Sequence, residues 1–126
     1  MKMGGETIFQ TNGMAIMITR GDSGLLTITA QSDFDFTEAD RAVFTVKDGE
    51  RVMKQETLTP ETDGSVQIAF LSAETERWPA RRPYRWDIRY VLDAVMDENG
   101  RVTDGREVIT PIQPQRMMVL EAVGSV

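Results

Sequence analysis

Hydrophobic and polar residues alternate along several short runs of this chain, and turn residues separate the runs. In the clearest run, Tyr84 to Leu92, every second residue is aromatic or aliphatic, while Arg85, Asp87 and Arg89 occupy positions between them. A period of two is typical of a strand with one buried face. We therefore expect a strand here, and further strands over residues 15–19, 25–30, 42–47, 51–57, 65–71, 107–110 and 115–123.

Turn signals separate these runs. Asp48-Gly49 and Asn99-Gly100 predict hairpin turns, because glycine accepts the positive φ that tight turns need. A further turn is expected at Asp63-Gly64. Ser72 to Arg77 predicts one short helical turn, with Ser72 as its N-cap. No segment has a long helical period, so the pattern predicts an all-β fold of about seven to nine short strands, in a sandwich or a barrel.

We expect the chain to divide into a short N-terminal arm, residues 1–13, and a single domain, residues 14–126. Within the arm, Thr7 to Gln10 either adds an edge strand or is disordered, and the sequence leaves both open. No apolar stretch follows Lys2, so we expect no secretory signal. No apolar run approaches the roughly 18 residues of a membrane helix.

The chain contains no cysteine and no histidine. The first absence excludes disulfides and thiolate nucleophiles, and the second removes the commonest general base and the commonest metal ligand. Chemistry based on carboxylates, tyrosine or lysine stays open. We expect a protein that is not an enzyme and that needs no cofactor or metal.

The charge of the chain limits the classes of molecule that it is expected to bind. The net charge of −6 makes nucleic acid and anionic membranes unfavourable partners, because both are polyanions. Eleven of the fourteen basic residues are arginine, the cation most enriched at protein–protein interfaces. The balance of charges favours a docking role between proteins.

Two short motifs admit a functional and a structural interpretation. Arg20-Gly21-Asp22 spells a cell-adhesion tripeptide, but the same residues are typical of a turn between two strands. The carboxylates of Asp33, Asp35, Glu38 and Asp40 are the ligands that calcium prefers. Their spacing lacks the glycine and the terminal glutamate of a calcium-binding loop, so we favour the structural interpretation for both motifs.

Aromatic residues and arginines are concentrated between Trp78 and Arg89. Such a mixture can stack on bases or sugar rings. The alternation places Tyr84 and Trp86 on the apolar face, where they are expected to pack in the core. Trp78, in the preceding loop, is expected to be exposed, and with Arg81 and Arg82 it forms a candidate interaction site.

Several segments, in their order along the chain, resemble the N-terminal domain of phage upper-baseplate and tail-fibre-attachment proteins, from siphophages and prophages of Gram-positive bacteria. The segments are Ile18 to Ser23, Ala42 to Lys47, Tyr84 to Arg89, Val108 to Pro111 and Met117 to Leu120. The resemblance covers residues 14–123. It implies an immunoglobulin-like antiparallel β-sandwich of about 7–9 strands. It carries over no catalytic residue, only the fold-signature positions Arg20, Gly21, Asp22, Tyr84, Trp86 and Asp87.

Two features depart from the family pattern: the segment from Asp93 to Arg106 is longer than the expected hairpin, and the N-terminal arm is extra. Family members usually continue into a fibre or receptor-binding region, so a chain that stops here is expected to act as an adaptor or minor tail component. The resemblance implies a virion protein made in the bacterial cytoplasm. Its expected partners are other tail or baseplate proteins and further copies of itself.

Two other function classes stay open. A carbohydrate-binding β-sandwich of a bacterial surface system would need an exposed platform formed by Trp78, Tyr84 or Trp86. A carboxylate hydrolase would need two facing acids in a cleft, with one of them buried. The structure can therefore separate these classes by the exposure of a few side chains.

Overall fold

The computed structural model describes residues 10–12, 15–28, 39–61 and 65–123. Within them, six strands form a large sheet in the order β1 (Gln10–Asn12), β2 (Ala15–Thr19), β10 (Glu107–Leu120), β7 (Tyr84–Leu92), β4 (Arg41–Asp48) and β5 (Arg51–Leu58). All neighbours pair antiparallel except β2 and β10, which run parallel.

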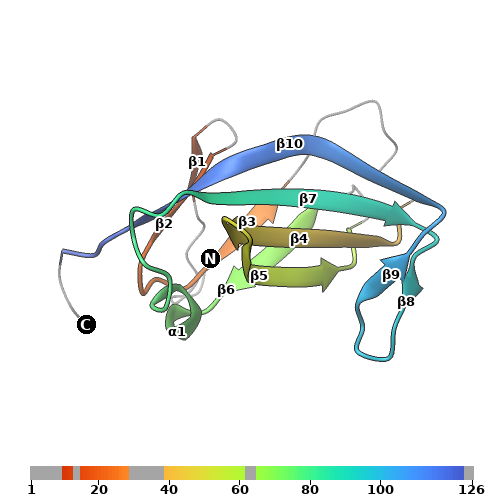
Figure 1. Ribbon diagram of the computed structural model, residues 1–126, viewed down its shortest axis with the longest axis horizontal. Coiled ribbons are helices and arrows are strands. Elements are labelled where there is room, and N and C mark those ends of the chain that lie inside the picture. Colours follow the sequence, from red (N-terminus) through yellow and green to blue (C-terminus); the bar gives the residue numbers. More distant parts are fainter. Residues whose placement is uncertain (1–9, 13–14, 29–38, 62–64, 124–126) are drawn as a thin grey trace, which may run out of the picture.

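A second, smaller sheet faces the large one. It pairs β3 (Gly24–Ile28) with β6 (Val66–Phe70) and lies behind the large sheet in Figure 1. A hairpin of β8 (Val95–Met96) and β9 (Val102–Asp104) and one helical turn, α1 (Ser72–Thr75), complete the described elements. The prediction of an all-β sandwich is confirmed. None of the described helices is long and apolar enough to cross a membrane.

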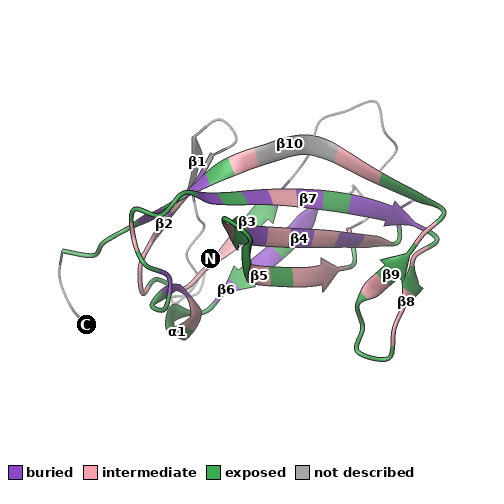
Figure 2. Cartoon of the chain, in the orientation of Figure 1, coloured by how far each residue is buried: buried purple, intermediate pink, exposed green. Residues whose placement is uncertain are grey.

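The core lies between the two sheets, as the alternation in β7 predicted. Tyr84, Trp86, Ile88, Tyr90 and Leu92 are all buried, and Figure 2 shows the alternation of buried and exposed residues along most of β7. Aromatic rings connect the layers: Phe44 of β4 meets Phe70 of β6 edge-on, with ring centroids 6.2 Å apart. Each such ring removes a large apolar area from water, so these contacts hold the two sheets together.

The end of the chain differs from the expectation of two closing strands. Residues 107–120 form one long strand, β10, which crosses from β7 to β2. The register with β7 shifts between Ile109 and Ile112 and again between Ile112 and Gln115. Pro111 and Pro114 fall in these intervals, and proline has no N–H to donate to the ladder. The prolines therefore interrupt the pairing without ending the strand.

The predicted helical turn is present as α1, but Ser72 is not its N-cap. The N-cap is Leu71, whose backbone N–H donates to the Glu74 carboxylate at 3.3 Å. The Ser72 hydroxyl instead donates to the carbonyl of Gly21 at 2.6 Å. A tertiary contact has replaced the local one, which is why the cap could not be predicted from the local sequence.

The two predicted hairpins are present. Gly49, between β4 and β5, has a φ of 61°, and Gly100, between β8 and β9, has a φ of 78°. The turn predicted at Asp63-Gly64 lies outside the described residues. Of the predicted arm, Gln10–Asn12 pairs with β2 as the edge strand β1, and residues 1–9 lie outside the described part. The prediction that 14–126 forms one domain stays a prediction.

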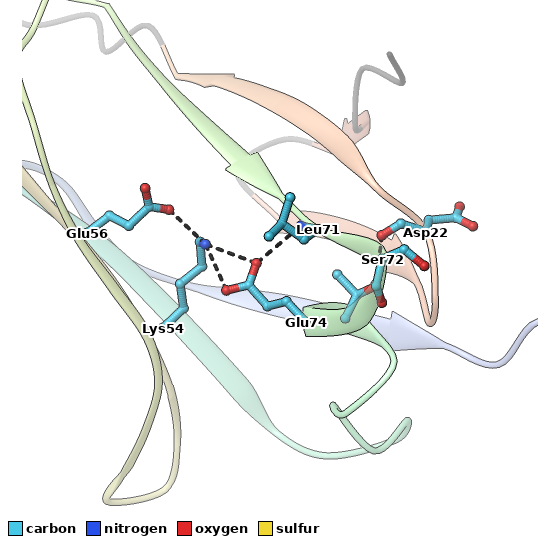
Figure 3. Close-up of polar contacts among 7 residues, drawn as sticks. Asp22, Lys54, Glu56, Leu71, Ser72 and Glu74 are labelled. Atoms are coloured by element: carbon cyan, nitrogen blue, oxygen red, sulfur yellow. Dashed lines mark hydrogen bonds and ion pairs between the residues drawn. The ribbon is translucent and has the colours of Figure 1, made fainter. Parts of the chain in front are cut away.

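The edge strand β5 places a lysine on the core side of the sheet. Lys54 lies opposite the buried Val46, and its side chain is only 7% exposed. Its ammonium pairs with Glu74 at 2.9 Å and with Glu56 at 2.7 Å (Figure 3). It also lies 4.9 Å from the centroid of the Phe70 ring. An inward charge on an edge strand discourages pairing with another strand. Lys54 thus links α1 to the large sheet through its ion pair with Glu74, and its charge protects the β5 edge from pairing with another strand.

Candidate functional site

The turn Arg20-Gly21-Asp22 is held against α1. The Thr75 hydroxyl, fully buried, accepts from the Gly21 N–H at 3.0 Å and donates to the Asp22 carbonyl at 2.7 Å. Arg20 donates from Nε to the Glu76 carbonyl at 2.9 Å and pairs with Glu121 at 3.2 Å. The tripeptide joins β2 to β3 and anchors the helix, so these contacts favour its interpretation as a structural turn.

The other three fold-signature residues lie on opposite faces of β7. Tyr84 and Trp86 are buried in the core, and the Tyr84 hydroxyl donates to the carbonyl of Pro79. Asp87 points to the outer face of the sheet and lies opposite Thr45 of β4. The Tyr-x-Trp-Asp segment therefore contributes its rings to packing and its carboxylate to the surface.

The expectation that Trp78 is exposed is wrong: its exposed fraction is 3%. The backbone N–H of Trp78 continues the turn of α1 by donating to the Thr75 carbonyl at 3.1 Å. This turn directs the indole inward, where it packs 6.0 Å from the ring centroids of both Phe70 and Tyr84. Trp78 therefore belongs to the core although it lies in a loop, because its indole packs against the rings of Phe70 and Tyr84.

Arg81 and Arg82 are exposed, as expected of an interaction surface. Arg81 has a φ of 63°, in the left-handed region that a non-glycine residue seldom adopts. Arg82 donates to both oxygens of Asp48, at 2.9 and 3.1 Å, which fixes the loop to the end of β4. With Trp78 buried, these two arginines do not form a site together with an exposed indole.

The outer face of the large sheet carries a groove that the sequence did not predict. It encloses about 840 Å³ between the faces of β4, β5 and β7 and the hairpin strand β9. Its floor combines charged residues with valine and threonine, because it is the solvent side of strands whose other side is buried. The lining residues include Val43, Thr45, Lys47, Gln55, Arg85, Asp87, Arg89, Val91, Val102, Thr103, Asp104 and Val108.

The segment that departs from the family pattern builds one wall of this groove. Within Asp93 to Arg106, Asp97 accepts backbone hydrogen bonds from Asn99 and Arg101, each at 2.9 Å, and so closes the β8–β9 turn. Gly105 returns the chain to the sheet so closely that a Cβ there would overlap the Val91 side chain. Val91 is consequently buried although it points to the outer face.

Charge on the groove floor is mixed. Lys47, Arg85 and Arg89 line it together with Asp87 and Asp104. Partial burial raises the pKa of the Asp87 carboxyl above its ordinary value, and the positive charges of Arg89 and Lys47 offset this effect only in part. Three cations against two carboxylates leave the groove with a small positive balance, which suits an anionic group better than a cation.

Comparison with solved structures identifies proteins of similar fold. The chain is similar to the N-terminal domain of ORF48 of phage TP901-1, with a TM-score of 0.52 and 14% identity, over 91% of this chain and 98% of that domain. The two share a fold. The resemblance noted in the sequence is thereby confirmed at the level of the fold, while the immunoglobulin-like classification stays a prediction.

Two larger proteins are similar over a smaller region. One is a glycoside hydrolase-like protein from Bacteroides vulgatus ATCC 8482, with a TM-score of 0.42 and 13% identity over 84% of this chain. The other is the pullulanase SAP of Group B Streptococcus, with a TM-score of 0.36 and 14% identity over 73% of this chain. The chain spans 16% and 13% of their lengths, and such low TM-scores say nothing about its function. No family model and no curated protein matches the sequence.

The acidic cluster considered for calcium is only partly described. Asp33, Asp35 and Glu38 lie outside the described residues, and the Asp40 carboxylate accepts from the Ala94 backbone N–H at 3.2 and 3.3 Å. Among residues whose placement is described, no three acidic side chains are grouped as metal ligands would be. The calcium interpretation therefore gains no support from Asp40.

The residues of the groove are distant along the chain, so no local sequence pattern indicates it. The alternation of Arg85, Asp87 and Arg89 along the sequence does indicate the exposed face of β7, which forms part of the groove floor. The neighbouring residue Lys47 and the wall from β9 depend on strand order and on the fold-back of the hairpin, which periodicity does not report.

Proposed function

We propose that this chain is a non-catalytic structural module of a phage or prophage tail or baseplate, where it docks neighbouring subunits during assembly. The observation that carries the proposal is the whole-domain similarity to the N-terminal domain of the phage protein, which extends over nearly the full length of both chains. A domain of matching extent and fold is a fold-level analogy, so the assembly role needs its own test.

The distribution of side chains supports a passive role. The described aromatic rings of β4, β6 and β7 are buried against one another, and thus hold the sheets together. Among the described residues, the surfaces available for contact include the outer side of the large sheet and its β1 edge, while the inward Lys54 discourages strand pairing at the β5 edge. Edge strands and loops are the parts of a sandwich that commonly dock partners.

The carbohydrate-binding alternative required an exposed aromatic platform. Trp78, Tyr84 and Trp86 are all buried, so none of the three can stack on a sugar ring without unfolding its surroundings. The structure therefore offers no specific observation in favour of that alternative, and we retain the assembly proposal alone.

The proposal is tested by measuring mass in solution. We expect sedimentation velocity of the full chain to show concentration-dependent oligomers, or a complex with the product of an adjacent tail gene co-expressed with it. A second protein without residues 1–13 removes β1 and opens the β2 edge, so its assembly should change. A strict monomer in both forms, at all concentrations and with every neighbouring tail protein, would overturn the proposal.

A further inference from the structure

Three cations stand side by side across the outer face of the large sheet. The register pairs Lys47 of β4 directly with Arg85 of β7, and Arg85 directly with Arg116 of β10. All three residues are exposed. Since neighbouring strands place such partners about 5 Å apart at Cβ, the three form a continuous cationic row across three strands.

This row is unfavourable for the isolated domain. Like charges directly opposite one another destabilise a strand pair. Elsewhere in the same sheet the register pairs opposite charges, as with Asp48 and Arg51 on β4 and β5. Within the described part of the chain, neither Lys47 nor Arg116 forms an ion pair. A chain with net charge −6 thus places three cations side by side on one face of its large sheet.

The row opens onto the groove and is bordered by exposed apolar side chains. Lys47 and Arg85 belong to the groove floor, which continues to Arg89. Val52 lies opposite Lys47 and is 50% exposed, while Val108, on the far side of the groove, is 44% exposed. Arginine next to accessible apolar residues is typical of a protein interface, whereas a nucleic-acid site is on average more polar and more strongly basic.

We propose that the cationic row of Lys47, Arg85 and Arg116, with the adjoining groove, binds an acidic extended segment of a partner protein. Carboxylates of that segment would accept hydrogen bonds from the guanidinium groups, which donate to both carboxylate oxygens in a two-point geometry. The chain's overall negative charge repels nucleic acid at a distance, so a protein with local acidic residues is the better match. This inference rests on the proposed docking function and assigns that function to one face.

The direct test uses a labelled peptide of alternating glutamate and serine, with an alternating glutamine and serine peptide as its neutral match. Fluorescence anisotropy should show that the full chain binds the acidic peptide, more weakly as salt rises, and does not bind the neutral one. In the double variant Lys47→Glu/Arg116→Glu we expect affinity to fall at least about tenfold, because two attractions become repulsions.

The matched control is Arg77→Glu/Arg101→Glu, which changes net charge equally at two exposed positions away from the row. It should bind the acidic peptide within about twofold of the unmodified chain, since the long-range field alone is altered. Circular dichroism and thermal unfolding establish that both variants are folded. Equal losses in the two variants, no binding by the unmodified chain, or tighter binding of single-stranded DNA than of the peptide would each overturn the inference.

Sedimentation of the same variants separates this inference from the proposed function. If Lys47→Glu/Arg116→Glu still assembles as the unmodified chain does, the docking function stands and the assignment of the face is wrong. If the unmodified chain forms no assembly but binds the acidic peptide through the row, the proposed assembly role is wrong and the assignment of the binding site is retained. If Lys47→Glu/Arg116→Glu loses both assembly and peptide binding while the control variant keeps them, the result supports the docking function and its assignment to this face.

Discussion

The hydroxyl of Thr75 bridges the backbones of Gly21 and Asp22: it accepts from the Gly21 N–H at 3.0 Å and donates to the Asp22 carbonyl at 2.7 Å. Thr75→Val keeps the shape but leaves both backbone groups without this partner. An unsatisfied buried polar group costs about 1–3 kcal/mol, so we expect the free energy of unfolding in urea to fall by about 2 kcal/mol.

The exposed Ser72 is the matched comparison, because its hydroxyl bonds the same turn at the Gly21 carbonyl. Ser72→Ala should cost less, about 0.5–1 kcal/mol, since water can replace the lost donor. Equal losses in the two variants would mean that burial of Thr75 does not matter for the turn.

The burial of Trp78 leads to a second prediction. Trp78→Ala should lower the free energy of unfolding by about 3–5 kcal/mol, because it empties the space between Phe70 and Tyr84. Arg82→Ala, in the same loop, should lower it far less than Trp78→Ala does, because the Arg82 side chain is 53% exposed and its removal empties no space in the core. A stable Trp78→Ala protein that loses binding on a glycan array would instead restore the carbohydrate-binding interpretation.

Trp78 also marks where sequence reasoning stops. Strict alternation identified the buried face of β7, since a strand with one face in the core repeats every two residues. Trp78 belongs to no such run. Its burial depends on tertiary contacts, because the turn after α1 packs its indole against Phe70 of β6. The cationic row is hidden for the same reason, because strand order alone brings Lys47, Arg85 and Arg116 together.

The ion pairs of Lys54 provide a third prediction. Lys54→Met retains the apolar stem over Phe70 but leaves Glu56 and Glu74 without their shared cation. Both carboxylates keep some contact with water, so we expect a loss of about 1–2 kcal/mol in urea unfolding, less than for a fully buried pair. Lys54→Arg, which keeps the charge, should lose less than Lys54→Met. The opposite order would show that packing outweighs charge at this position.

Asp87 predicts how stability depends on pH. The pKa of its carboxyl is raised by burial above the ordinary value of 3.8, so the folded protein binds its proton more tightly than the unfolded chain does. Ionisation of Asp87 therefore disfavours folding: this penalty is fully present above the folded pKa and vanishes below the unfolded one. Asp87→Asn should thus be more stable than the unmodified chain at neutral pH.

That advantage should shrink to nothing as the pH falls through the raised pKa and then below 3.8. Urea unfolding across the acidic range measures it, with Glu98→Gln, an exposed change in the hairpin turn, as the matched variant. An Asp87→Asn protein that is less stable at neutral pH would show that attraction to Arg89 and Lys47 outweighs burial.

The contact between Gly105 and Val91 is the last prediction, and it concerns the wall of the groove. A Cβ at position 105 would overlap Cγ1 of Val91, which is only 2% exposed and cannot move aside cheaply. Gly105→Ala should therefore lower the free energy of unfolding by about 1–3 kcal/mol, as overpacking does elsewhere. Val91→Ala alone should also destabilise, because it leaves a cavity under the hairpin. In the double variant the new methyl enters that space, so the combined loss should be smaller than the sum of the single losses. Additive losses would mean that the hairpin does not rest on Val91, and the β9 wall would then be held by other contacts.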